Sequence, residues 1–398
     1  MKFRVAVIGQ GYVGLPLSLA AASAGHNVIG IDKDLKKNDL LNSGISPIEG
    51  INSDEILEVL TLKKYTSTNS YEAIIDCDVI CVCVPTPLGI DRKPDLTLLK
   101  QVLAKLAKYL KENTLVVIES TIQPGTTRNI LTQILEKGSG LKRENFYVAY
   151  SPERIDPGNT KWNIKNTPKL VAGLDKRSVE KAINFYGTFV NTVEVCESLE
   201  VAETAKLLEN SFRLINISFV NELSIFCQEL GINALDVITA AATKPYGFMA
   251  FYPSIGVGGH CIPVDPLYLA QKADEVGVSL KLINLADEIN LTMPKYFVKL
   301  AQDKLGDLRN KHIIVIGVSY KANISDVRET AVEALIEGLR QSGAIVVWHD
   351  DLVKEWKGEK SIALSSKYDL AILATPHDYL DLSKLGSVPI LNTQGSSQ

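Results

Sequence analysis

The chain has 398 residues, of which 46% are hydrophobic and 22% are charged. That length exceeds one ordinary core and predicts two or three domains, and the composition is typical of a globular protein. The formal net charge is −4, with 42 lysines and arginines against 46 acidic residues, and no basic run occurs. Nucleic acid and anionic membrane surfaces are therefore not expected as partners. No apolar run in the sequence reaches the about 20 residues that cross a bilayer.

The six cysteines lie at spacings that do not resemble those of metal ligands, so no metal site is expected. Cys81 and Cys83 stand in an apolar run and are predicted to be small buried side chains. This use of cysteine indicates a reducing compartment, and we predict a cytoplasmic protein.

The first part of the chain alternates apolar strands with helical patterns. Strands are predicted over 4–8 and 28–31 with a helix over 15–24 between them, and continuous apolar runs follow at 79–84 and 115–118. Runs of this kind are typical of parallel strands that are buried on both faces. The pattern predicts a doubly wound α/β domain over 1–197.

The second part of the chain has a helical pattern. Residues 198–230 contain neither proline nor glycine, which predicts one helix about 48 Å long at 1.5 Å per residue. Apolar residues recur on more than one face, so this helix has to be buried between domains or against a second subunit. We therefore predict a central helical domain over 198–301 and a homodimer that forms through the long helix.

A second strand-then-glycine pattern begins the third part of the chain at 311–317. A helix over 330–342 and strands over 344–348 and 368–375 complete a smaller unit of βαβ type. The fold class expected for the whole chain is α/β. Two Rossmann-like doubly wound domains, the second over 302–398, are joined by the long central helix and a helical middle domain.

The turn after the first strand has the glycine spacing of a dinucleotide site. The first glycine permits the tight turn, the second lets the backbone approach a pyrophosphate, and the third lets helix and strand pack closely. Asp32 ends the second strand, where a carboxylate accepts a hydrogen bond from a ribose 2′-hydroxyl and repels a 2′-phosphate. NAD is therefore the expected cofactor; a purely structural turn would account for the glycines but not for Asp32. The cofactor contacts expected in this turn are Gly9, Gly11, Tyr12, Val13 and Gly14.

Two further loops follow apolar strands, at 84–87 and 119–125. Loops at the carboxyl ends of parallel strands line the ligand crevice of such sheets. Pro85, Thr86 and Thr121 are therefore candidate contacts of the cofactor or of a water molecule. Ordinary capping of the loops by the two threonines explains the pattern equally well.

The segment around Cys261 is the most unusual in the chain, because three glycines precede the cysteine within six residues. Glycines let the backbone approach a ligand and leave the thiol accessible, so Cys261 is a candidate nucleophile. A buried, inert cysteine is the alternative. The adjacent His260 is expected to stabilise the loop rather than to act as a base.

Lys206 and Asn210 are four residues apart and share one face of the long central helix. A lysine and an asparagine inside an apolar helix need partners, because unpaired burial is unfavourable. They are candidates to donate hydrogen bonds to an oxyanion. The alternative is a solvated strip that also includes Glu203.

With these residues the chain resembles the UDP-glucose/GDP-mannose dehydrogenase family over essentially its whole length. The motifs that carry the resemblance are the glycine turn at 9–14, Val84-Pro85-Thr86-Pro87, Ser151-Pro152-Glu153-Arg154, the helix with Lys206 and Asn210, Gly258-Gly259-His260-Cys261, and the segment from Lys321 to Arg328.

The resemblance implies a four-electron oxidation of a nucleotide sugar at C6, from alcohol to carboxylate, with two NAD. It implies that Cys261 forms a thiohemiacetal and then a thioester, while Lys206 and Asn210 stabilise the oxyanion. Asp265 is implied in proton transfer, and Thr121 in holding a water molecule. Among acids that could activate that water, we favour Glu153.

The remaining roles also follow from the resemblance. Lys37 and Arg328 match cofactor contacts, and the carboxyl-terminal domain is expected to hold the UDP part of the substrate. The matching substrate contacts are Glu153, Arg154, Lys206, Asn210, Tyr252, Gly258 and Lys321.

One segment departs from the glucose-type pattern. After Ser-Pro-Glu those enzymes carry a longer acidic pattern, whereas residues 154–158 here are Arg-Ile-Asp-Pro-Gly. The chain resembles the branch that acts on N-acetylated sugars, and 244–249 is similar to enzymes that oxidise UDP-N-acetylglucosamine. UDP-N-acetylmannosamine and UDP-glucose are the alternative substrates, and surface polysaccharide precursors are the expected products. Two other activities compete: a two-electron hydroxyacid dehydrogenase, and a redox-sensing dinucleotide-binding protein.

Overall fold

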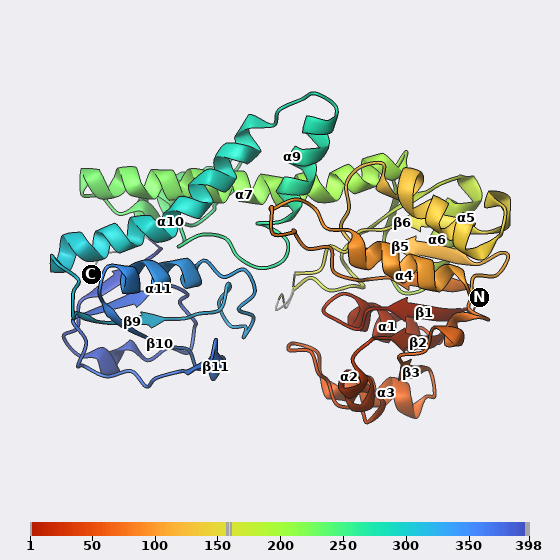
Figure 1. Ribbon diagram of the computed structural model, residues 1–398, viewed down its shortest axis with the longest axis horizontal. Helices are drawn as coiled ribbons and strands as arrows, with labels where there is room; N and C mark the ends of the chain where they lie inside the picture. The colour runs from red at the N-terminus through yellow and green to blue at the C-terminus, as the bar shows by residue number, and fades with distance from the viewer. Residues whose placement is uncertain (1, 157–158, 160, 395–398) are drawn as a thin grey trace. The chain divides into compact units, whose positions relative to one another are not determined.

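The computed structural model describes residues 2–156, 159 and 161–394 (Figure 1). Contacts divide the chain into two compact units, Met1–Leu208 and Glu209–Gln398. Helix α7 (Leu199–Leu230) runs across this boundary as one continuous element. Each unit is built around its own sheet.

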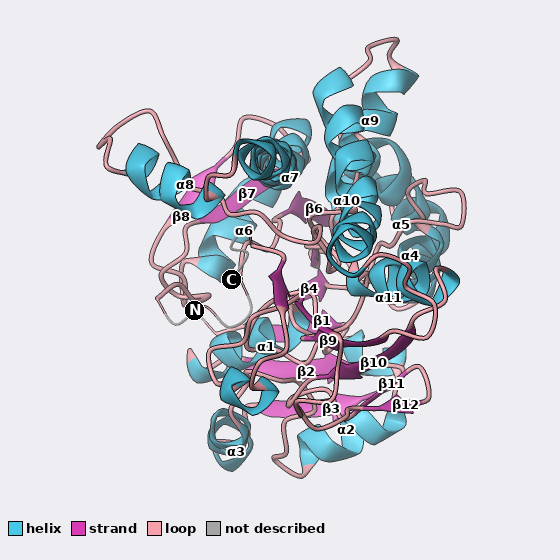
Figure 2. Ribbon diagram, turned by 90° about the vertical axis from the view of Figure 1, so that its left-hand side faces the viewer, coloured by secondary structure: helices cyan, strands magenta, loops and turns pink. Residues whose placement is uncertain are grey.

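The first unit holds an eight-stranded sheet in the order β3-β2-β1-β4-β5-β6-β7-β8. Its neighbours β6 and β7 are antiparallel, and the other paired strands run parallel. Figure 2 shows β1, β2 and β3 side by side. The strands are β1 (Arg4–Ile8), β2 (Asn27–Ile31), β3 (Tyr65–Thr68), β4 (Val79–Val82), β5 (Leu115–Ile118), β6 (Tyr147–Tyr150), β7 (Lys169–Gly173) and β8 (Val193–Val195).

Alternate strand residues of this sheet face two different helical layers. Val5 and Val7 of β1 belong to the core that packs against α1 and α6. On the opposite side α4 packs against α5, and their apolar residues are buried. A sheet that is covered on both faces explains why its strands are continuous apolar runs. The helices are α1 (Gly14–Ser23), α2 (Leu35–Asn42), α3 (Ser53–Thr61), α4 (Thr97–Ala107), α5 (Thr132–Ser139) and α6 (Lys176–Tyr186).

The second unit combines helices with a parallel four-stranded sheet in the order β10-β9-β13-β14. One face of this sheet forms a core with α10 and α11, and the other face is covered by a smaller apolar cluster. The elements are α8 (Ala234–Ala242), α9 (Asp265–Glu275), α10 (Lys281–Leu305), β9 (His312–Ile316), α11 (Val332–Gln341), β10 (Ile345–His349), β13 (Leu370–Leu373), β14 (Ile390–Asn392) and the hairpin β11 (Glu355–Trp356) with β12 (Glu359–Lys360).

The predicted fold class is confirmed: the first unit carries a mainly parallel sheet and the second a parallel sheet, both of Rossmann type, and the long central helix is present. The proposed domain boundaries at 197/198 and 301/302 stay predictions. Within the part of the chain that the structure describes, no helix has the length and apolarity that a bilayer crossing requires.

Helix α7 is less completely covered in the single chain than its composition suggests. An apolar stripe along it is exposed, and Phe219 and Phe226 keep 61% and 58% of their accessible surface. At 100° per residue the members of this stripe lie within about 40° of one another around the helix axis. They are Val201, Leu208, Phe212, Phe219, Phe226 and Leu230. Among the large apolar residues described in α7, only those of this α7 stripe are exposed, and the others are buried or half-buried in the single chain.

Candidate active site

The three glycines after β1 differ in what a side chain at each position would contact. Gly9 has φ +93°, and a Cβ there would lie 2.5 Å from the carbonyl oxygen of Cys83. A Cβ at Gly14 would lie 1.8 Å from the carbonyl oxygen of Gly9. A Cβ at Gly11 would meet none of the described atoms within 4 Å. The fold itself therefore requires Gly9 and Gly14, whereas Gly11 leaves open space ahead of α1, where the sequence predicts that a pyrophosphate binds.

Asp32, at the end of β2, is held as an ionised acceptor. Its carboxylate accepts hydrogen bonds from the backbone N–H of Gln10 at 2.9 Å and of Asp34 at 3.0 Å, and from Nζ of Lys37 at 2.9 Å. Burial alone would raise the pKa of Asp32, but these donors outweigh it and hold that pKa below its usual value. A charged carboxylate beside the glycine turn suits a ribose diol and repels a 2′-phosphate. Lys37, predicted as a cofactor contact, is here the ion-pair partner of Asp32.

The two predicted loops after β4 and β5 lie together. Oγ1 of Thr86 donates to the carbonyl oxygen of Thr121 at 2.7 Å, and Oγ of Ser120 donates to the carbonyl oxygen of Val84 at 2.7 Å. Pro85 is exposed at the turn of the first loop. The hydroxyl of Thr86 thus caps the neighbouring loop, and the structure brings both candidate threonines to the carboxyl ends of adjacent strands.

A buried ionic cluster that the sequence did not predict lies at the same edge of the sheet. Nζ of Lys169 donates to Oε2 of Glu119 at 2.7 Å and to Oε2 of Glu153 at 3.0 Å. The hydroxyl of Tyr186 donates to Oε1 of Glu119 at 2.5 Å. Glu119 directly follows the apolar strand β5, and Lys169 begins the apolar strand β7. A charged residue directly at the end of one apolar strand and another at the start of a second apolar strand were the signal in the sequence.

This cluster bears on the role expected for Glu153. Its Oε1 accepts the backbone N–H groups of Arg154 and Ile155, each at 2.6 Å. Burial would raise the pKa of Glu153, but Lys169 and these two N–H donors hold it below the usual value. Burial raises the pKa of Glu119 in the same cluster. A carboxylate with a lowered pKa is a weak base, so the geometry favours Glu153 as an acceptor that fixes its loop, and its role in water activation stays a prediction.

Glu203 is not part of a solvated strip. It is fully buried on α7, and its two oxygens accept the backbone N–H of Gly125 at 2.6 Å and of Thr127 at 3.0 Å. These groups open the helical turn Thr127–Leu131 that leads into α5. Burial raises the pKa of Glu203 to about 7. Glu203 therefore ties the loop that carries Thr121 to α7, one helical turn before Lys206.

In the second unit the glycine loop ahead of Cys261 packs closely on another segment. A Cβ at Gly258 would lie 2.6 Å from the carbonyl oxygen of Glu329, and one at Gly259 would lie 2.8 Å from the ring of Tyr320. The N–H of Gly259 donates to the carbonyl oxygen of Arg328 at 3.0 Å. Both glycines are therefore needed for close packing against the segment 320–329, which contains the predicted contacts Lys321 and Arg328.

Cys261 is exposed, unlike the other five cysteines, which are buried or half-buried. The N–H of Asp265 donates to the carbonyl oxygen of Cys261 at 2.9 Å, and this bond joins the cysteine to the first turn of α9. The carboxylate of Asp265 is buried and accepts a 2.5 Å hydrogen bond from Nδ2 of Asn210. The structure thus brings Asn210 and Asp265 together at the first turn of α9, shortly after Cys261.

The other predicted residues occupy varied settings. Lys206 is half-buried on α7, one turn before Asn210. Arg154 donates to the carbonyl oxygen of Pro168 at 2.9 Å, and Arg328 forms an ion pair with Asp326. Tyr252 is largely exposed. Burial and Arg328 lower the pKa of His260, which favours its neutral form.

Pro157 and Gly158, which belong to the segment that departs from the glucose-type pattern, lie outside the described residues. The described residues contain no cluster of three or more His, Cys, Asp or Glu side chains that could hold a metal ion.

Comparison with known proteins places this arrangement in a family. The model of the UDP-glucose/GDP-mannose dehydrogenase family matches the chain in three parts: its NAD binding domain over residues 3–190, its central domain over 200–292, and its UDP binding domain over 314–389. The chain therefore belongs to this family, as its motifs predicted. It is an oxidoreductase of nucleotide sugars, and NAD is its cofactor.

Individual relatives match over nearly their whole length. The UDP-N-acetyl-D-mannosamine dehydrogenase of Pyrococcus horikoshii is 34% identical, over 94% of this chain and 89% of that protein. The UDP-N-acetyl-D-glucosamine 6-dehydrogenase of Pseudomonas aeruginosa is 33% identical, over 94% of this chain and 90% of that protein. The solved structure of a UDP-D-ManNAc dehydrogenase from Pyrococcus horikoshii is similar with a TM-score of 0.91 at 30% identity, covering 99% of this chain and 95% of that one.

The buried cluster predicts a large stability effect at Lys169. In Lys169→Met the carboxylates of Glu119 and Glu153 lose their shared cation, which destabilises the fold by about 3–5 kcal/mol. Denaturant unfolding measures this loss. The double variant Lys169→Met/Glu119→Gln removes one of the stranded charges and should recover part of it. The exposed Lys165→Met is the matched control; a loss at Lys169 no larger than at Lys165 would contradict the prediction.

The raised pKa of Glu203 predicts a pH-dependent contribution to stability. The pKa in the folded state, about 7, lies above the ordinary value of 4.5. The contribution is therefore complete below pH 4.5 and is lost as the pH rises through 7, by about 3 kcal/mol in all. Glu203→Gln does not titrate, so the stability of the wild type relative to this variant should fall over that range. Unfolding curves at several pH values test this, and a constant difference would refute it.

Proposed function

We propose that this protein oxidises the C6 alcohol of a UDP-N-acetylhexosamine, with UDP-N-acetylglucosamine as its substrate, to the uronic acid. The observation that carries the proposal is the exposed residue Cys261, which stands shortly before α9 on a glycine loop packed against the segment of Lys321. A two-electron alcohol dehydrogenase needs no such thiol, whereas a reaction that continues to the acid needs a nucleophile to hold the aldehyde.

In the proposed mechanism the C6 alcohol first loses a proton and a hydride and becomes an aldehyde. The Cys261 thiolate adds to this aldehyde and forms a thiohemiacetal, so the intermediate stays in the site. Loss of a second hydride gives a thioester on Cys261. Water then attacks the thioester, releasing the carboxylate and regenerating the thiol. The balance is two NAD⁺ and one water consumed, and two NADH and three protons formed for each sugar.

The residues of the chain divide this work. The glycine turn and Asp32 would hold NAD, which accepts the hydride at each oxidation step. Lys206 and Asn210 would donate hydrogen bonds to the oxygen that becomes negative on the reacting carbon. The bond from Asn210 to Asp265 supports proton transfer by Asp265, because it fixes this carboxylate next to the Cys261 loop. Thr121 would hold the water.

The remaining predicted contacts concern binding. In this proposal Lys321, Arg154, Tyr252 and Gly258 contact the UDP-sugar, and Lys37, Thr86 and Pro85 line the cofactor site together with Arg328. Binding energy from the distant UDP group orients C6. A thiol nucleophile has to stay reduced, which supports the proposed cytoplasmic location.

UDP-N-acetylmannosamine is the second candidate substrate. Relatives named for the mannosamine and the glucosamine substrate are 34% and 33% identical to this chain, so identity does not separate them. The glucosamine preference rests on the similarity of residues 244–249.

The proposal predicts two NADH for each molecule of UDP-N-acetylglucosamine and the uronic acid as product. Cys261→Ser should lower the rate of acid formation by more than about a hundredfold, because the aldehyde is no longer held covalently. A panel of UDP-sugars with NADH counted per sugar consumed, and the product identified by mass, measures both.

Cys196→Ser serves as the matched control, because Cys196 is half-buried and lies after β8. It should retain wild-type turnover. One NADH per sugar, or normal acid formation in Cys261→Ser, would refute the mechanism. Faster turnover of UDP-N-acetylmannosamine than of UDP-N-acetylglucosamine would identify the mannosamine compound as the substrate.

We also propose that the chain forms a homodimer through the α7 stripe. Six large apolar side chains along one line of a 32-residue helix form an exposed surface of the kind that marks a protein interface. Their spacings of seven and four residues are those of a helix–helix seam.

The dimer proposal predicts that Phe219→Glu/Phe226→Glu is a monomer, because two charges would be buried in the seam. Mass by light scattering or sedimentation should fall to half of the wild-type value. Gln228→Glu adds one negative charge on the opposite side of α7 and should stay dimeric. An unchanged mass in the double variant would exclude this surface.

A further inference from the structure

The start of the second sheet repeats the backbone geometry of the first. Gly317 follows β9 with φ +80°, and its N–H donates to the carbonyl oxygen of His349 at 2.8 Å. Gly9 follows β1 and donates in the same way to Ile31 at 2.7 Å. The next N–H then binds an aspartate at the end of the neighbouring strand: Val318 donates to Asp350 at 2.9 Å, as Gln10 does to Asp32. Asp350 is therefore the structural counterpart of Asp32.

The two aspartates differ in what else they bind. Asp32 pairs with the partly exposed Lys37 and keeps some exposure of its own. Asp350 is fully buried, and its two oxygens accept four donors. They are the N–H groups of Val318, Leu352 and Val353 and Nε2 of His377. These donors occupy the lone pairs that a ribose diol would need, so Asp350 does not serve as a ligand-reading carboxylate.

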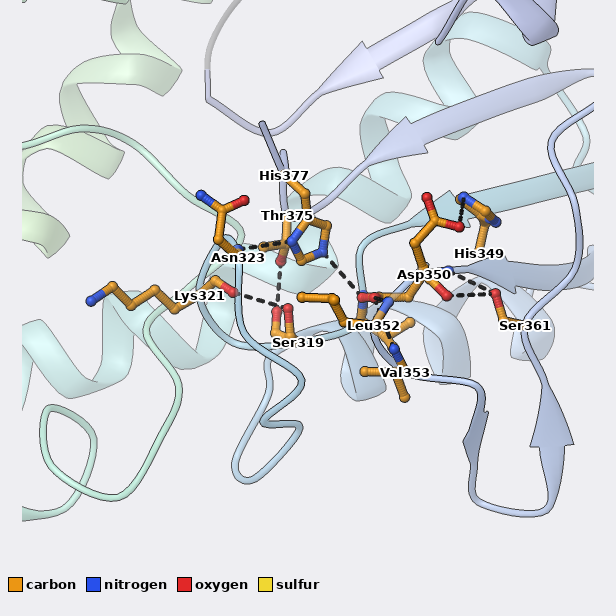
Figure 3. A network of polar contacts seen from close by, with 12 residues as sticks. Ser319, Lys321, Asn323, His349, Asp350, Leu352, Val353, Ser361, Thr375 and His377 are labelled. Carbon is orange, nitrogen blue, oxygen red and sulfur yellow. Dashed lines mark hydrogen bonds and ion pairs between the residues drawn. The ribbon is translucent and has the colours of Figure 1, made fainter. Parts of the chain in front are cut away.

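His377 connects Asp350 to the loop that contains Asn323. Its side chain is fully buried, and Nε2 lies 3.1 Å from Oδ2 of Asp350. Nδ1 accepts the backbone N–H of Asn323 at 2.9 Å. Because Nδ1 accepts, the proton lies on Nε2 and is donated to Asp350. The carboxylate therefore fixes the tautomer and orientation that let the imidazole bind the loop (Figure 3).

The loop held in this way carries Lys321. Residues 317–331 between β9 and α11 form neither helix nor strand, so their shape depends on side-chain contacts. Thr375 donates to the carbonyl oxygen of Ser319 at 2.7 Å, and Oγ of Ser319 donates to that of Lys321 at 2.9 Å. The side chain of Asn323 exchanges hydrogen bonds with Asp378. Figure 3 shows Lys321 between these two anchored positions, Ser319 and Asn323.

We propose that His377, oriented by Asp350, is a positioning residue that sets the affinity of this enzyme for the UDP part of its substrate through the Lys321 loop. This inference rests on the proposed function, in which Lys321 contacts the UDP-sugar. The aspartate that reads a ribose in the first sheet is, in the second sheet, a fixed support for a loop that presents a cation to a nucleoside diphosphate.

Two substitutions separate the two bonds of His377. Glutamine carries its amide near the position of Nε2 and keeps a donor for Asp350, but it lacks the acceptor for Asn323. Asparagine carries its amide near the position of Nδ1 and keeps that acceptor, but it leaves Asp350 without one donor. Loop positioning predicts that His377→Gln weakens UDP binding more than His377→Asn. A purely structural role predicts the opposite order, because the stranded buried carboxylate destabilises the asparagine variant more.

The expected result is a rise of about tenfold in the KM for the UDP-sugar and in the Kd of UDP for His377→Gln, which is about 1.4 kcal/mol. The kcat at saturating sugar and the KM for NAD should change less than twofold. His312→Asn, an exposed histidine in the same unit, is the matched control. Thermal unfolding of each variant gives the stability order separately.

If the histidine variants fold poorly, Thr375→Val tests the same role of the loop through its second contact, the hydrogen bond from Thr375 to Ser319. It removes the donor to Ser319 with little change in shape, and it should raise the same two constants. Unchanged KM and Kd in Thr375→Val, or an affinity order that follows the stability order in the His377 variants, would overturn the inference. Calorimetry with UDP alone separates failure of this inference from failure of the proposed function. If the wild type binds UDP but oxidises no UDP-sugar, the proposed function is refuted. The role of His377 is then decided by the Kd of UDP in the variants.

Discussion

The carboxyl-terminal edge of each parallel sheet imposes the constraint on which the rest of this structure depends. There the chain leaves the first strand so close to the neighbouring loop that no side chain fits. A Cβ at Gly9 would lie 2.5 Å from the carbonyl oxygen of Cys83, and one at Gly317 would lie 2.1 Å from that of Thr375. Once glycine turns the chain at this point, the next N–H faces the end of the adjacent strand and demands an acceptor. An aspartate supplies it in both sheets, and the following loops are arranged around that carboxylate.

Each buried acid in these sites has a distinct set of donors, and the donors decide what it is able to do. Asp32 keeps partial exposure and a lowered pKa, so it is available to a ligand as an anion. Glu119 and Glu153 share Lys169, and Glu153 also accepts two N–H groups of its own loop. Glu203 binds two N–H groups at a helix start and so links α7 to the Thr121 loop. Desolvation penalises every such charge, and at Glu203 the two N–H donors do not offset it, so that the pKa of Glu203 rises to about 7.

Much of this could be predicted from the sequence, because the strongest patterns are local. The glycine spacing with Asp32, the proline-free run of α7 and the glycines before Cys261 each depend on a few neighbouring residues. Sequence reasoning missed Lys169, Glu119 and His377, whose partners lie 50, 67 and 27 residues away. It did not foresee that distant Lys169 lowers the pKa of Glu153, the acid favoured for activating water, whose role stays a prediction. Pairing over such distances is not visible in a local motif, and an epimeric hydroxyl is likewise recognised by the folded pocket rather than by a motif.

The two sheets show how one scaffold serves two nucleotides. A dinucleotide has a pyrophosphate that backbone N–H groups at a helix start bind directly, and three glycines suffice to admit it. The second unit keeps the first glycine of this pattern but has Ser319 and Ala322 where the others would stand. In the function that we propose, Lys321 on the longer loop after β9 takes over the phosphate contact that backbone N–H groups make in the first unit. A lysine on an unanchored loop would lose its binding energy to conformational entropy. In our proposal the Asp350–His377 pair limits that freedom, and Asp350, the counterpart of Asp32, is saturated with donors from its own chain.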